Sequence, residues 1–411
     1  MALVTRTEQI QFKSDTIGSL CHASKNLFNL ANYYVRQRFF ENDKHYKETG
    51  EKGNHLWYKE LYHLVKDTEA YKGLYAKTAQ QILRLLDKSW KAYFKALKLW
   101  LVQPELFLGK PRPPKYKHKN GEHLLIFTNQ QCKIKDGILK FPKICDLELK
   151  TGLKDVDLRE VRIIPNGFNY TCEIVYQKEI DEREIDSSRL TGLDLGTRNI
   201  ATMANNFGAE PIVVKGGTAN SINQFYNKEK ARIQSVYDHQ KIKFGRKMSK
   251  LNWKHNNKIN DYFHKLSRMI VNYASTNNVK TIVIGKNDNW KQNVNIGKRN
   301  NQKFVQLPLA RLIEMIQYKA QELSIEVVLQ EESHTSKCSF LDMESIEHHD
   351  KYVGKRIKRG LFRSAKGIII NADVNGALNI IRKAIPKAFA DGIEGIGLYP
   401  KRCLITSFKC I

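Results

Sequence analysis

The chain has 411 residues, and 69 Lys and Arg against 42 Asp and Glu give it a formal net charge of +27. Its apolar share of 41% excludes a disordered chain and is sufficient for globular cores. So basic a chain is expected to bind a polyanion, and nucleic acid is favoured because no apolar run of about 18 residues could span a bilayer. We therefore expect a cytoplasmic protein of two or three domains with no membrane partner.

In the N-terminal half, apolar residues at helical spacing predict helices over residues 14–38 and 77–101. Either Ser14 or Asp15 could cap the first of these helices. The second helix repeats basic residues every three or four positions on one face: Arg84, Lys88, Lys91, Lys95 and Lys98. Like charges on one face repel unless an anion lies against them, so this face is a candidate phosphate-binding surface, with an ordinary solvated face as the alternative.

A basic, proline-rich segment, GKPRPPKYKHKNG at 109–121, comes next. Its prolines exclude a helix, and Lys115 and Lys117 flank Tyr116, which indicates either a linker or a loop that binds a nucleic-acid backbone. From 123 to about 178 the pattern becomes strand-like, with HLLIFTN, GILKFP, VRIIP and YTCEIVYQ. The polar segment 178–189 is the predicted domain boundary.

After the boundary the order of elements is informative. Three strands are predicted first, RLTGLDLG, IATMANN and PIVVKGG, followed by a basic helical stretch over about 219–276 that includes Arg246 and Lys247. The strand VKTIVIGK, a helix over 308–323, the strand IEVVLQEE and the helix NADVNGALNIIRKAI complete the order. This order predicts an α/β domain of the RNase H-like class, with a mixed sheet and helices on its faces.

Two aspartates lie at the positions where an RNase H-like domain would carry catalytic carboxylates. Asp194 ends the first strand, where an unpaired carboxylate is costly to bury, although DLGT also suits a strand-end turn or the phosphate loop of an actin-like ATPase. Asp373 begins the last helix, where it could be only a cap or a dipole partner, and Asn371 could equally cap. Together with a third carboxylate, they are expected to hold two divalent cations, which prefer oxygen ligands.

The third carboxylate is missing from its usual strand. Gly285 stands where a glutamate should follow the fourth strand, and Asp288 lies farther on, in a predicted loop. The fifth strand is expected beside the fourth, and it ends in Glu331 and Glu332. We predict that Glu332 reaches the same cations from this neighbouring strand, with Glu331 as the second choice. Two solvated acids before a turn are the alternative.

These motifs resemble those of TnpB, the RNA-guided nuclease of bacterial insertion sequences that is related to type V CRISPR effectors. GLDLGTRNIA is similar to its first RuvC motif, NADVNGALNI to its third, and EESHTSKCSF to the start of its zinc ribbon. The resemblance implies a wedge-type β-barrel (1–13 and 117–187) with a helical recognition insert (14–116), an α+β half. A RuvC nuclease domain (188–383) and a C-terminal tail (384–411) would follow. Within the nuclease domain, 219–276 would be a basic helical insert and 335–370 a degenerate zinc-ribbon region.

The resemblance also implies cutting of DNA that pairs with a guide RNA made from the transposon end. Double-stranded target DNA with a short adjacent motif, Mg²⁺ ions and a separate transposase of the same element are the other implied partners, in a bacterial, nucleoid-associated setting. By position, Asp194 and Asp373 match two catalytic aspartates. If the relocated glutamate does not bind the metal ions, the alternative is a nuclease-inactive, RNA-guided DNA-binding repressor. A strand-joining transposase has no separate end-binding domain to support it, and an actin-like ATPase has no second phosphate loop.

The zinc ribbon's cysteines are the second departure from the family pattern. The seven cysteines include no CxxC pair, and none lies between Cys338 and Asp373, so a zinc site is not expected. Cys338, His348 and His349 are the remaining metal-binding alternative. The basic stretch GKRIKRGLFR, with Lys355, Arg356 and Arg359, is expected to contact a phosphate backbone instead.

Overall fold

The computed structural model describes residues 2–180, 185, 188–287, 305–390, 392–403 and 405. The chain divides into two compact units: an N-terminal unit, Leu3–Glu179, and a C-terminal unit, which joins Met1–Ala2 to Ile180–Ile411. The division falls inside the predicted boundary segment 178–189. Both units mix helices with strands, and none of the described helices is both long and apolar enough to cross a bilayer.

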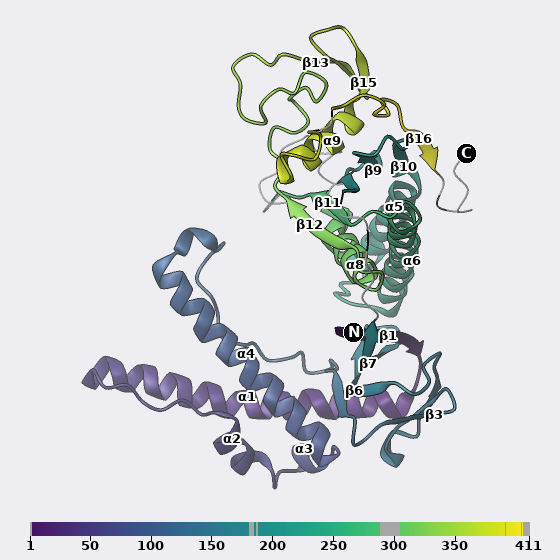
Figure 1. The fold of residues 1–411 in the computed structure, drawn as a ribbon. Coiled ribbons are helices and arrows are strands. Elements are labelled where there is room, and N and C mark those ends of the chain that lie inside the picture. The colour runs from purple at the N-terminus through teal and green to yellow at the C-terminus, as the bar shows by residue number, and fades with distance from the viewer. Residues whose placement is uncertain are drawn as a thin grey trace. The chain divides into compact units, whose positions relative to one another are not determined.

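Four helices form the helical part of the N-terminal unit (Figure 1): α1 (Asp15–Thr49), α2 (Tyr58–Val65), α3 (Glu69–Lys72) and α4 (Ala76–Val102). Ser14, not Asp15, caps α1, because its side chain accepts a hydrogen bond from the Ile17 amide. The helix continues past residue 38, where the apolar repeat that predicts it ends. Its exposed last turns carry the ion pair Lys47–Asp43 at 2.7 Å, and Gly50 ends the helix in the left-handed conformation.

Two small sheets complete the N-terminal unit. The larger has the strand order β1 (Ala2–Phe12), β7 (Tyr170–Ile180), β6 (Asp157–Pro165) and β2 (Leu125–Thr128). The smaller joins β3 (Lys133–Lys135), β4 (Ile138–Lys140) and β5 (Glu148–Lys150). Single-turn 3-10 helices lie at Pro104–Leu106 and Lys143–Cys145. Buried apolar side chains of the helices and of both sheets form one continuous core.

A six-stranded mixed sheet forms the centre of the C-terminal unit. Its order is β12 (Glu326–Gln330), β11 (Thr281–Gly285), β8 (Leu190–Asp194), β9 (Asn199–Asn205), β10 (Ile212–Lys215) and β16 (Lys401–Cys403). β11 runs parallel to both β8 and β12, whereas β9 is antiparallel to β8 and β10. The five expected strands are present in the expected order along the chain. Within the expected C-terminal tail, 384–411, the strand β16 joins the edge of the sheet by parallel pairing with β10.

Helices cover both faces of this sheet (Figure 1): α9 (Ala372–Ala384) packs on one face, and α6 (Arg246–Thr276) and α8 (Leu309–Gln321) contribute to the core on the other. The expected basic helical stretch is two helices, α5 (Gly217–His239) and α6, joined by a turn at 240–245. Side chains alternate between the faces of a strand. Thus Leu193 belongs to the core beside α6 and α8, whereas Leu190 belongs to the core beside α9.

Candidate active site and nucleic-acid interface

Asp194 lies at the end of β8, on the face of the sheet that α9 covers. The same alternation that turns Leu193 away from α9 turns Gly192 and Asp194 toward it. A Cβ at Gly376, in the first turns of α9, would lie only 3.2 Å from the Asp194 Oδ2 atom. Glycine at 376 therefore lets the helix approach the carboxylate closely.

Asp373 is in the first turn of α9, but it is not the helix cap. Asn371 is the cap, and its side chain accepts hydrogen bonds from the amides of Asp373 and Val374. The Asp373 carboxylate is therefore available for other contacts. Its Oδ2 accepts a hydrogen bond from the Asn199 side chain on β9, and its Oδ1 is 3.6 Å from a nitrogen of Arg356. The capping alternative for Asp373 is thus wrong.

The structure gives the two glutamates after β12 different surroundings. Lys383 on α9 lies 2.6 Å from the Glu331 carboxylate, which also accepts hydrogen bonds from Ser333, and these bonds lower the pKa of Glu331 to about 2. Glu332 is half-buried, and burial, reinforced by the neighbouring charge of Glu331, raises its pKa to about 7. Glu331 is therefore neutralised by its own partner, while the Glu332 carboxylate faces the sheet.

Gly285 provides the space that Glu332 occupies. A Cβ at position 285 would lie 2.5 Å from the Glu332 Oε2 atom, closer than real Cβ contacts allow. Asn287 holds the glutamate in place, since its Oδ1 accepts a hydrogen bond from the Glu332 amide and its Nδ2 donates to Oε1. The Glu332 carboxylate thus lies directly against the position where the fourth strand would otherwise carry its own glutamate. Asp288 lies outside the described residues.

The charges of Asp373 and Glu332 both affect the pKa of Asp194. Burial, together with the smaller effect of repulsion from Asp373 and Glu332, raises the pKa of Asp194 to about 8. The charge of Arg356 only partly opposes this rise. Carboxylate oxygens that repel one another suit a hard divalent cation, because its positive charge would reduce the repulsion. Among the residues described, no three His, Cys, Asp or Glu side chains already stand in a metal-binding arrangement. In ligand chemistry, three carboxylates fit Mg²⁺.

The raised pKa of Asp194 predicts how stability depends on pH without metal. The folded carboxyl keeps its proton up to about pH 8, whereas the unfolded one loses it near 3.8, so this contribution is present at low pH and is lost as the pH rises between those values. In EDTA at pH 8, Asp194→Asn should therefore raise the melting temperature by about 4 °C or more. Thermal melts at pH 4 and pH 8 check this, and a variant that melts below the wild type at pH 8 would contradict it.

Three further residues of this site, Asn199, Asn287 and Lys215, were not predicted from the sequence. Asn199 donates to Asp373 and accepts a hydrogen bond from the Lys215 ammonium at 2.9 Å, which links β9 and β10 to the acids. Asn287 holds Glu332 as described above. Asn199 and Asn287 follow Asp194 and Gly285 closely in sequence, but asparagines after strands are too common in turns to have singled them out.

The region expected to be a degenerate zinc ribbon is held together by polar side chains. It contains the small sheet β13 (Lys355–Lys358), β14 (Leu361–Arg363) and β15 (Ile369–Asn371). The buried Glu344 accepts hydrogen bonds from the amides of Ser339 and Val353. Asn379 and Asn375 on α9 both donate to the Cys338 carbonyl, at 2.8 Å and 2.9 Å. Burial raises the pKa of the Cys338 thiol, which disfavours the thiolate that zinc needs.

We predict that this region keeps its fold without zinc and depends on Glu344. Glu344→Ala should destabilise the protein by about 1–3 kcal/mol, because the buried Ser339 amide loses its acceptor and the more exposed Val353 amide loses a hydrogen bond. Glu347→Ala, at a more exposed carboxylate nearby, is the matched control and should melt like the wild type. Thermal melts and metal analysis of the purified protein check both points, and one zinc ion per chain would contradict the prediction.

The predicted nucleic-acid contacts are all exposed, and they lie on four elements of the two units. Arg84, Lys88, Lys91, Lys95 and Lys98 line α4; Lys115 and Lys117 lie in the proline-rich loop; Arg246 and Lys247 start α6; Lys355, Arg356 and Arg359 lie in or beside β13. Lys91 forms an ion pair with Asp87 at 2.7 Å. Among the described residues Lys88, Lys95 and Lys98 have no acidic partner, which leaves their charges available to an anion.

The proline-rich segment 109–121 is an anchored loop and not a free linker. Asn29 on α1 forms reciprocal hydrogen bonds with the backbone of Lys117, and Asn32 and Arg36 both donate to the Pro114 carbonyl. The loop borders a hollow of about 490 Å³ whose other walls come from α1 and α4. The loop is hydrogen-bonded to α1, and α4 also packs against α1. The lysines of the loop are therefore held near α4.

Comparisons with known proteins found similar families and one similar fold. Residues 173–291 match the OrfB_IS605 family, described as "Probable transposase", and residues 310–380 match the "Cas12f1-like, TNB domain" family. The TnpB-like protein ORF457 of Acidianus two-tailed virus is 25% identical over 413 residues, which cover 91% of this chain and 84% of the relative. The structure of a Cas12f1–sgRNA–target DNA complex contains a chain with the same fold, at a TM-score of 0.50 and 13% identity. The match covers 92% of this chain and 98% of that one.

Proposed function

We propose that this TnpB-like protein, which is related to the type V effectors, is an RNA-guided DNA endonuclease that depends on divalent metal ions. One arrangement carries the proposal: Asp194 ends β8, Glu332 lies against Gly285 at the end of the paired strand β11, and Asp373 is in the first turn of α9, which packs on this face of the sheet. The three acids come from separated stretches of a strongly basic chain. The strand order of the C-terminal sheet supports an RNase H-like (RuvC) nuclease domain. The two sheets and four helices of the N-terminal unit would then be the wedge and the recognition insert.

In this proposal, Asp194, Glu332 and Asp373 hold Mg²⁺. The bound ions would supply an activated water and stabilise the charge on the leaving oxygen of a phosphodiester. Asn199 and Asn287 keep Asp373 and Glu332 in place, and Gly285 keeps room for the Glu332 carboxylate. Exposed lysines and arginines of both units bind the phosphates of a guide RNA and of target DNA, while base pairing supplies the sequence specificity. By analogy with the family, the guide would come from the transposon end.

The test is to sequence the RNA that co-purifies with the protein and to offer DNA that matches it, beside a short adjacent motif. With Mg²⁺ the duplex should be cut, and with EDTA it should be bound and remain intact. Tight binding without cutting under Mg²⁺ would favour the repressor. No specific co-purifying RNA would contradict RNA guidance itself.

Salt dependence tests the role of α4 separately. The variant with Lys88, Lys95 and Lys98 all changed to Ala should bind nucleic acid about tenfold more weakly at low salt, and the slope of log affinity against log salt should fall by roughly 2. Lys47→Ala is the control, because Asp43 already neutralises this exposed lysine of α1. Equal slopes for the triple variant and the wild type would show that α4 does not contact phosphates.

A further inference from the structure

A hollow of about 380 Å³ lies between α5 and α6 and is lined by aromatic and basic side chains. Phe225 and Tyr226 on α5 and His255 on α6 provide the rings. Lys254 and Lys258, one turn apart on α6, lie at its rim and are both exposed. The nuclease chemistry proposed above uses none of these residues.

The rings of this hollow are arranged for stacking. Tyr226 and His255 are stacked with their centroids 4.1 Å apart, and the Tyr226 hydroxyl donates to Asn252 while His255 contacts Asn223 at 2.7 Å. These bonds fix the two rings as one wall. Burial lowers the pKa of His255, which favours the neutral imidazole at neutral pH. Phe225, in contrast, is 60% exposed, so an aromatic face remains uncovered.

Charge and polarity indicate what would cover that face. The Lys258 ammonium is 5.8 Å from the Phe225 ring centre, and that of Lys230 is 5.9 Å from the Tyr226 ring centre. A flat ring with an attached phosphate would satisfy both features, because the ring can stack on Phe225 and the phosphate can pair with the lysines.

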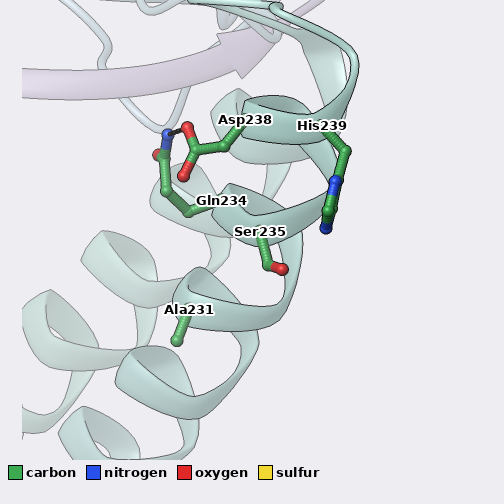
Figure 2. A pocket seen from close by; sticks show the side chains of 5 residues that line it. All are labelled: Ala231, Gln234, Ser235, Asp238 and His239. Atoms are coloured by element: carbon green, nitrogen blue, oxygen red, sulfur yellow. Dashed lines mark hydrogen bonds between the residues drawn. The ribbon is translucent and has the colours of Figure 1, made fainter.

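We propose that this hollow, defined by Phe225, Tyr226, His255, Lys254 and Lys258, binds an unpaired nucleobase of single-stranded nucleic acid. The base stacks on Phe225, and the two lysines bind the adjoining phosphates. The neighbouring hollow near the end of α5 makes a useful contrast (Figure 2): it is lined by Ala231, Gln234, Ser235, Asp238 and His239, and Gln234 donates to Asp238. It offers neither a lysine nor a stacked aromatic pair.

The test measures binding of short labelled single strands, one of RNA and one of DNA, to the full chain in EDTA, so that it does not depend on cutting. Phe225→Ala should weaken binding of at least one strand by fivefold or more, and Phe225→Tyr should restore it. Binding of a blunt duplex should not change. Gln234→Ala, in the hollow of Figure 2, is the matched control and should bind like the wild type. The strand that is affected identifies whether RNA or DNA supplies the base.

A second readout locates the contact directly. Single strands that carry 5-iodouracil cross-link on irradiation to an aromatic ring stacked on the base, and peptide mass spectrometry should find the cross-link on Phe225, Tyr226 or His255. Unchanged affinity of Phe225→Ala for both strands would overturn the proposal. So would equal weakening of duplex binding, or cross-links confined to other parts of the chain. Because both assays omit Mg²⁺, a failure of the nuclease proposal would leave their outcome unaffected.

Discussion

Replacing Asp194 or Asp373 by Asn, or Glu332 by Gln, is expected to lower the rate of DNA cutting by roughly a thousandfold or more. Each change removes a negative ligand from a site whose metal ions supply several kcal/mol of transition-state stabilisation, and each 1.4 kcal/mol corresponds to a factor of ten. Binding of guide and target should remain, since the phosphates are held elsewhere. Single-turnover cutting and filter binding, measured on the same preparations, separate the two effects.

Glu331→Gln is the matched control for Glu332→Gln, since the two residues are adjacent and the substitution is the same. The Glu331 carboxylate is already paired with Lys383, so this variant should cut at a rate within a few-fold of the wild type. If Glu331→Gln is inactive and Glu332→Gln is active, the roles of the two glutamates are reversed. Full activity of both variants would remove the relocated glutamate from the mechanism.

The second large effect is expected at Gly285. Gly285→Ala should reduce cutting at least tenfold, because its Cβ would displace the Glu332 carboxylate from 2.5 Å away. The double variant Gly285→Glu with Glu332→Ala returns the carboxylate to the fourth strand. It should cut at least tenfold faster than Glu332→Ala alone, because the two positions lie against the same space.

Melting temperatures must accompany these rates, since a side chain at 285 also meets the Ile380 Cδ1 atom at 2.6 Å. That atom is the flexible end of its side chain and can move aside at a modest cost. A double variant that melts like the wild type and yet is as inactive as Glu332→Ala would show that the neighbouring strands are not interchangeable carriers of the glutamate.

Much of the fold follows from the sequence because its signals are strong and local. The alternation and length of apolar runs predict five strands of the C-terminal sheet in their order, and helical spacing predicts α4 almost to its ends. Shorter elements escape such reasoning. β16 and β13–β15 have only three or four residues each, and the exposed, basic β13 has no apolar pattern at all. The exposed end of α1 depends on ion pairs and a glycine cap, which an apolar repeat does not report.

The acidic residues of the candidate site could be predicted from the sequence, but the residues that hold them in place could not. Strand-end carboxylates in a basic chain stand out, so Asp194, Asp373 and the Glu331–Glu332 pair could be named from the sequence. The difference between the two glutamates comes from Lys383, about fifty positions away, and therefore from tertiary structure. The same holds for the hydrogen bond from Asn199 to Asp373.

Anomalous diffraction from crystals of the complex with guide RNA and uncut target DNA, soaked in Mn²⁺, would locate the metal ions of the proposed nuclease site. We expect metal peaks bound by Asp194, Asp373 and Glu332, and their loss in the Asp194→Asn variant. Peaks that involve the aspartates but not Glu332 would contradict the relocated glutamate. No peak among the three carboxylates would contradict the metal-dependent nuclease itself.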